Sequence, residues 1–134
     1  MKLDIYVNYK ENCCEAFQFY EKNLGGRMIS ITTFGEMPHA AAMAGGREDK
    51  ILHARIEIGG TVLMGADVPV AEPMRSAYLT LTFNQVSEVE RTYALLADGG
   101  EIFMKIQETP FASRFAMLRD KFGTSWMLLH QEDK

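Results

Sequence analysis

The pattern of apolar and polar positions predicts the same order of elements twice along the chain. Residues 3–9 alternate and are rich in β-formers, which predicts a strand. Residues 11–24 then carry apolar side chains at helical spacing and end at Gly25-Gly26, a typical helix stop. Three more strands are predicted after this helix, over residues 27–34, 51–58 and 61–66.

The second half of the chain repeats this order. Residues 77–83 alternate as a strand, and a helix is predicted over residues 86–98, ending at Gly99-Gly100. Three further strands are predicted over residues 101–107, 114–119 and 125–131. An internal repeat of this kind determines the architecture before any single residue does.

The repeat predicts an α+β fold, a single domain made of two β-α-β-β-β modules. They cover about residues 1–67 and 76–134 and are joined by a linker over 68–75. Neither module can bury the inner face of an open sheet alone. We therefore expect the modules to form curled mixed sheets around a cavity, which is where a ligand would bind.

Residues 35–50 have no clear period and are an insertion that the second half lacks. We interpret this loop as a mobile cover over the cavity, with His39 closing on the ligand. The alternative is a surface excursion without a role, in which His39 is solvated.

Composition and charge exclude several classes of function. Apolar residues make up 47% of the 134 residues and charged residues 24%, which is typical of a globular domain. The net charge of −4, without a Lys/Arg cluster, argues against a nucleic-acid partner. No segment resembles a membrane span or a signal peptide. The only cysteines, Cys13 and Cys14, are adjacent and are expected to be reduced thiols of a cytoplasmic protein.

Several motifs resemble a known family. Residues 5–9, followed by 14–20 and Leu24-Gly25-Gly26, resemble the opening of the vicinal oxygen chelate superfamily, which includes glyoxalase I, bleomycin-resistance proteins and extradiol dioxygenases. Residues 51–54 with 58–60, and 114–115 with 120–123 and Trp126, are similar to its PhnB-like branch. The resemblance spans nearly the whole chain and implies the glyoxalase/bleomycin-resistance fold.

Metal-dependent members of that superfamily place a His or Glu in the first strand of each half and a Glu in the last strand. Those positions fall here on Leu128, around Met64, on Tyr78 and, in the first strand, on Asp4, Ile5 or Tyr6. Only Asp4 is a plausible ligand for a divalent metal. The resemblance therefore implies a relative without the usual metal site, and we expect no metal and no cofactor.

Some side chains are candidates for contact with a ligand, although no catalytic residue can be named. His53 is either a pocket base or a hydrogen-bonded histidine at the start of a strand. Asp67 is either a site residue or a turn cap, and Trp126 either stacks on a ligand or anchors the core. Arg114 either pairs with an acidic ligand or is exposed. The complete candidate set is Tyr6, His39, His53, Met64, Asp67, Tyr78, Arg114 and Trp126.

Two other groups of residues receive a structural interpretation. His130 lies near the C-terminal tail and is expected at the surface. The strand methionines suit either an adaptable apolar pocket or a core, and we favour the core; they are Met28, Met64, Met104, Met117 and Met127.

Three functions remain open at this point. The first is a protein that binds a small, partly apolar molecule without a metal. The second is a metal-dependent lyase, isomerase or dioxygenase of the same superfamily, and the third is a dimeric scaffold without a ligand. We expect a homodimer in each case, because two open, curled sheets leave strand edges and apolar surface to be covered.

Overall fold

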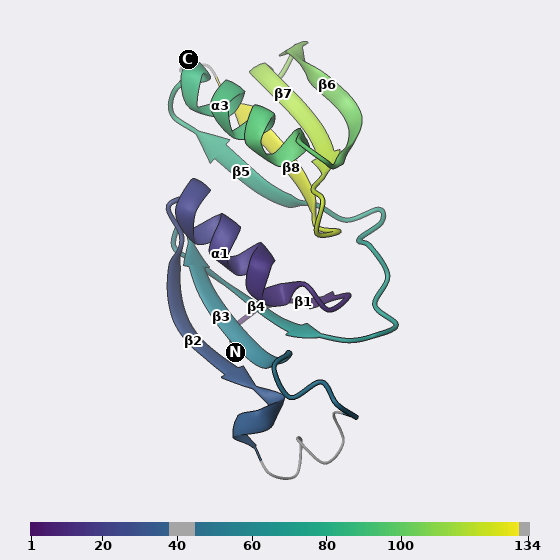
Figure 1. The fold of residues 1–134 in the computed structure, drawn as a ribbon. Helices are drawn as coiled ribbons and strands as arrows, with labels where there is room; N and C mark the ends of the chain where they lie inside the picture. The colour runs from purple at the N-terminus through teal and green to yellow at the C-terminus, as the bar shows by residue number, and fades with distance from the viewer. Residues whose placement is uncertain (38–44, 132–134) are drawn as a thin grey trace. The chain divides into compact units, whose positions relative to one another are not determined.

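The computed structural model describes residues 1–37 and 45–131. The chain forms two compact units, Met1–Glu72 and Pro73–Lys134, and each packs one long helix against one four-stranded sheet (Figure 1). The predicted α+β fold of two repeated halves is thereby confirmed. Within the described residues, no helix is long and apolar enough to cross a membrane.

The first unit has the order predicted from the sequence. It contains β1 (Ile5–Tyr9), α1 (Cys13–Asn23), β2 (Arg27–Thr33), the 3-10 turn η1 (Phe34–Glu36), β3 (Ile51–Ile58) and β4 (Thr61–Asp67). The strands lie in the order β1-β4-β3-β2. β1 pairs parallel with β4, and the other pairs are antiparallel.

The core of the first unit lies between α1 and the sheet. The buried side of α1 carries Ala16, Phe17 and Tyr20, whose spacing of one, three and four residues keeps them on one stripe. Gly65 of β4 faces this stripe, because a Cβ built there would lie 2.9 Å from the Phe17 ring. A side chain at position 65 would therefore displace the helix.

The second unit repeats the arrangement with β5 (Leu79–Phe83), α3 (Val86–Ala97), β6 (Glu101–Thr109), β7 (Ala112–Arg119) and β8 (Ser125–His130). Its strands lie in the order β5-β8-β7-β6, and β5 pairs parallel with β8. Residues Pro110 and Phe111 alone separate β6 from β7, whereas residues 34–50 separate β2 from β3. The longer connection in the first half is thus an insertion, as predicted.

The core of the second unit is built around the single tryptophan of the chain. Trp126 is 1% exposed, and its indole N–H donates a 2.8 Å hydrogen bond to the carboxylate of buried Asp120. The other Asp120 oxygen accepts from the backbone N–H groups of Phe122 and Thr124. One carboxylate therefore holds both the β7–β8 turn and the tryptophan in place.

The structure corrects the interpretation of the methionines as core residues. Met28, Met64, Met117 and Met127 are only half-buried, and Met104 is 36% exposed. The core is filled instead by aliphatic and aromatic side chains on the helix side of each sheet. The sequence could not distinguish the two faces of these strands, because both carry apolar residues.

Candidate functional site

Each side chain of the first sheet points either towards α1 or to the opposite side, which we call the helix-free face. Ala54, Ile56 and Ile58 of β3 are buried, and Ala54 pairs with the helix-facing Gly65. Because side chains alternate along a strand, His53 and Arg55 lie on the helix-free face.

Two more predicted residues share this face. Arg55 pairs with Met64 across β3 and β4, and Met64 pairs with Tyr6 across β4 and β1. Directly paired residues point to the same side of a sheet. Tyr6, Met64 and Arg55 therefore form one row across three strands, with His53 two residues from Arg55.

The Tyr6 and His53 rings form a stacked pair on this face. Their centroids are 6.1 Å apart and their planes differ by 25°. β1 and β3 are separated by β4, a distance of about 10 Å between strands, so the two side chains lean towards each other over β4. The result is a partly apolar pair of rings on the helix-free face, and each ring also carries a polar group.

The Tyr6 phenol keeps its proton over a wide pH range. The side chain is 50% exposed, yet its partial burial raises the pKa of the phenol, and the nearby Cys13 thiol raises it further. Tyr6 is therefore a neutral hydrogen-bond donor at neutral pH, and it adds no negative charge to the helix-free face.

Tyr78 lies in the second unit, just before β5. Its ring meets Phe103 of β6 edge to face, with centroids 6.3 Å apart, although β5 and β6 are the two edge strands of the sheet. The Arg119 guanidinium lies 5.5 Å from the centre of the Phe103 ring and pairs with Glu101 at 2.8 Å. The curl of the sheet brings these side chains together.

Asp67 is a structural residue of the first unit. It is 3% exposed, and its two carboxylate oxygens accept 2.8 Å hydrogen bonds from the backbone N–H groups of Cys13 and Ile51. The sequence analysis interpreted Asp67 as the cap of a turn. In the structure it caps the start of the distant helix α1 and not a turn of its own. Both oxygens are used within the fold.

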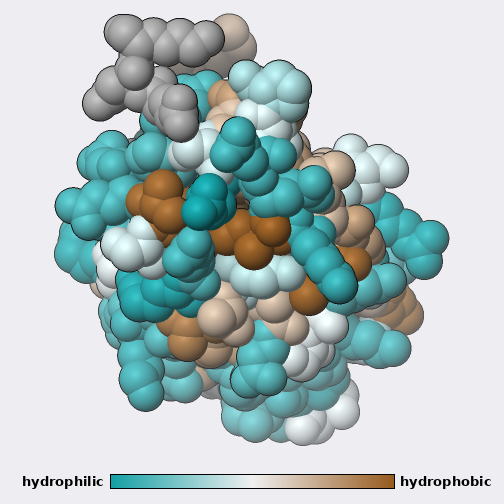
Figure 2. Space-filling model, turned by 90° about the horizontal axis from the view of Figure 1, so that it is seen from above, coloured by the Kyte–Doolittle hydropathy of each residue, from teal (hydrophilic) through white to brown (hydrophobic). Residues whose placement is uncertain are grey.

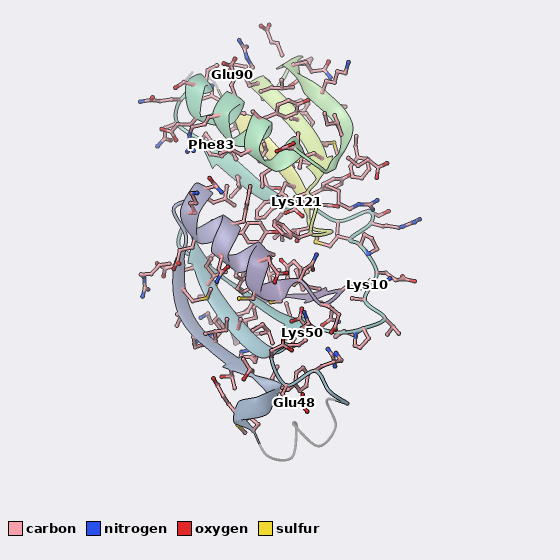
Figure 3. All side chains as sticks on the ribbon, in the orientation of Figure 1. Lys10, Glu48, Lys50, Phe83, Glu90 and Lys121 are labelled. Carbon is pink, nitrogen blue, oxygen red and sulfur yellow. The ribbon has the colours of Figure 1, made fainter. Side chains whose placement is uncertain are left out.

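Arg114 and Trp126 also take part in internal contacts. The Arg114 Nε atom lies 3.2 Å from the Glu90 carboxylate on α3, a helix residue labelled in Figure 3. Trp126 lies in the core against Asp120. Both side chains belong to the second unit, whereas Tyr6 and His53 belong to the first.

The predicted cover over the site falls partly outside the described residues. His39 belongs to residues 38–44, which lie outside the described residues. The described end next to β3 is anchored: Arg47 pairs with Glu11, with Nε 2.6 Å from Oε2, and Lys50 Nζ donates to the Glu11 carbonyl at 3.1 Å. Lys50 lies at the β3 end of the connection in Figure 3.

The residues do not fit the metal site of metal-dependent relatives. A divalent metal needs several N, O or S donors that converge on one point. Across residues 1–37 and 45–131, no group of three or more His, Cys, Asp or Glu side chains could hold a metal ion. Of the positions where the resemblance places ligands, Leu128 is fully buried in the core and Met64 offers only a thioether.

Sequence reasoning missed the placement of Arg55 and the hydrogen-bonded environment of His130. The alternation of β3 places Arg55 on the same face as His53, and this signal was available. His130 is half-buried: its Nδ1 is hydrogen-bonded to Ser113 Oγ, and its Nε2 lies 3.2 Å from the Asn84 carbonyl. It borders a polar cavity of about 320 Å³ with Thr82, Phe83, Asn84 and Gln131.

Known proteins resemble this chain in sequence and in fold. The family model described as "Glyoxalase/Bleomycin resistance protein/Dioxygenase superfamily" matches residues 3–128. Protein YjdN of Escherichia coli K12 is 33% identical over 138 aligned positions, which cover 96% of this chain and 94% of that protein.

Two solved structures are similar over nearly the full chain. Protein PA1353 from Pseudomonas aeruginosa has a TM-score of 0.88 and 32% identity, with 99% of both chains covered. A Bacillus cereus protein described as a putative 3-demethylubiquinone-9 3-methyltransferase, PhnB protein, has a TM-score of 0.82 and 25% identity, with 97% of this chain and 99% of that chain covered. The resemblance predicted from the motifs is thereby confirmed.

Proposed function

The chain belongs to the glyoxalase/bleomycin resistance protein/dioxygenase superfamily, and we propose that it binds a small, partly apolar molecule without the metal of its metal-dependent relatives. The observation that carries this proposal is the stacked pair of Tyr6 and His53 on the helix-free face of the first sheet. A half-exposed tyrosine held against a second ring offers a planar surface for a ligand. Met64 beneath it adds a flexible thioether that can adapt to the ligand's shape.

Metal-dependent chemistry is the alternative, and the residues support it less well. The row across β1, β4 and β3 holds a phenol, a thioether and a guanidinium. A guanidinium cannot serve as a metal ligand, because it remains protonated and has no acceptor. The corresponding row of the second sheet pairs Thr80 with Met127 and Met127 with Met117. These side chains favour binding over metal catalysis.

The proposal is tested with 2-naphthol, a neutral aromatic probe, by NMR of protein labelled in the methionine methyl groups. We expect saturable shifts of the Met64 signal, assigned with Met64→Leu. Tyr6→Ala should weaken binding, whereas the matched control Phe111→Ala, which removes an aromatic ring 59% exposed in the second unit, should not. Absence of a saturable Met64 shift, or equal binding by Tyr6→Ala, would refute the proposal.

The same proposal includes a homodimer, with a second copy of this chain as the partner. Ile102, Phe103 and Met104 of the edge strand β6 are each 36–44% exposed. An edge strand with exposed apolar side chains can pair with a strand of another molecule. The face seen in Figure 2 carries hydrophobic patches between hydrophilic residues. Sedimentation at micromolar concentration should give twice 15.1 kDa, and Phe103→Lys should shift the equilibrium towards monomer. A wild-type monomer would contradict this part of the proposal.

A further inference from the structure

Arg55 is a cation on the helix-free face of the first sheet for which the described residues provide no partner. Two other cations of the first unit have carboxylate partners: Arg27 lies 3.5 Å from the Glu57 carboxylate, and Lys2 lies 3.6 Å from that of Asp4. In the part of the chain that the structure describes, no hydrogen bond or ion pair joins the Arg55 guanidinium.

The position of Arg55 makes this lack of a partner significant. Arg55 is half-buried in β3, an inner strand, so its side chain as a whole is less hydrated than that of a fully exposed surface arginine. Removing a charge from water costs free energy unless an opposite charge or hydrogen-bond acceptors replace the water. A guanidinium offers five N–H donors in a planar fork that matches an oxyanion.

Arg55 and the ring pair are placed to contact two parts of one molecule. Arg55 pairs with Met64, and Met64 pairs with Tyr6, so the guanidinium lies in the same row as the phenol, on the other side of β4. His53, two residues from Arg55 in β3, stacks on Tyr6. A planar group over the rings can therefore carry a substituent that reaches Arg55.

We infer that the ligand of this face is a small organic anion, in which a planar unsaturated group rests on Tyr6 and His53 and an oxyanion pairs with Arg55. This inference rests on the proposed function and adds the chemical class of the ligand. Carboxylate and phosphonate share the oxyanion chemistry that a guanidinium recognises. The neutral phenol of Tyr6 does not repel such an anion and can donate a hydrogen bond to it.

Four probes separate the parts of this inference, again followed through the Met64 methyl signal. Benzoate and phenylphosphonate carry both the ring and an oxyanion, benzamide keeps the ring without the charge, and cyclohexanecarboxylate keeps the charge without the planar ring. We expect saturable binding of benzoate, phenylphosphonate or both, and binding of benzamide and cyclohexanecarboxylate that is at least about tenfold weaker. The anion that binds with the higher affinity identifies the preferred oxyanion.

Arg55→Met removes the charge and keeps much of the side-chain volume. It should weaken binding of the preferred anion at least about tenfold and leave the affinity for 2-naphthol unchanged. The matched control is Arg91→Met, which removes an exposed arginine of α3 in the other unit and should change neither.

The outcomes distinguish this inference from the proposed function. If 2-naphthol binds but benzamide binds as tightly as benzoate, or Arg55→Met has no effect on the anion, the anionic class is wrong and the binding function stands. If neither anion binds while 2-naphthol does, the inference fails in the same way. If 2-naphthol also fails to bind, both are overturned.

Discussion

The Asp67 carboxylate accepts a 2.8 Å hydrogen bond from the backbone N–H of Cys13, although 54 residues separate the two in the chain. Cys13 is the first residue of α1, and the flanking Asn12 supplies no side-chain cap. A negative charge at this end of a helix is favourable, and the N–H would otherwise be buried without an acceptor. The last residue of β4 thus fixes the start of the helix that covers the sheet.

Asp67→Asn should lower the free energy of unfolding by about 1–3 kcal/mol. An amide retains one acceptor oxygen, so either the Cys13 or the Ile51 N–H loses its partner. Urea denaturation measures the effect, with the exposed Asp98→Asn as a control that should stay within about 0.5 kcal/mol of wild type. An Asp67→Asn protein as stable as the control would show that the two hydrogen bonds contribute little.

Gly65→Ala should destabilise the protein by about 1–3 kcal/mol through overpacking. The new methyl group would lie 2.9 Å from Phe17 Cζ and 3.2 Å from Cys13 Sγ, so α1 must shift. The penalty should shrink in a Phe17→Leu background, where the close ring atom is absent. A double-mutant cycle by urea denaturation gives this coupling, and strictly additive effects would argue against a direct clash.

The Cys13 thiol should be inert in the folded protein and should make stability fall at alkaline pH. Burial raises the pKa of Cys13 well above its usual value near 9, and the Asp67 carboxylate raises it further. Below pH 9 the thiol is protonated in both states. Above pH 9 the unfolded chain loses the proton first, so the free energy of unfolding decreases by up to about 1.4 kcal/mol per pH unit.

The pH dependence is measured by urea denaturation between pH 8 and 10.5. Tyr and Lys side chains also titrate in this range, so the difference between wild type and Cys13→Ser isolates the thiol. The native wild-type protein should react with iodoacetamide at Cys14, because this residue is partly exposed. The reaction should be slow, because burial also raises the pKa of the Cys14 thiol. Rapid alkylation of Cys13 would contradict its buried position.

The purified protein should contain no stoichiometric Zn, Ni, Fe or Mn. The reason is the donor set: Met64 and Leu128 stand where the family resemblance places metal ligands, and the residues described by the structure form no cluster of three donors. Elemental analysis after dialysis without a chelator checks this. One tightly bound metal ion per chain would favour the enzymatic alternative over the proposed function.

The sequence alone determined the repeated β-α-β-β-β order, because the change from alternating to helical spacing and the Gly-Gly stops are local properties of the chain. The same alternation assigned Ile51–Ile58 correctly to a strand. It also implied that Arg55 and His53 lie on the same face of that strand, because side chains two residues apart in a strand point to the same side.

Only the tertiary structure decided what each candidate side chain does. Asp67 and Trp126 are polar or aromatic residues of the kind found in sites, yet strand pairing and helix packing direct both into the core. Tyr6 and His53 lie far apart in the sequence. They meet because β4 pairs with both of their strands and so places them in one sheet, where the two side chains lean towards each other over β4. Register and packing are non-local, so no pattern within one segment specifies which faces meet.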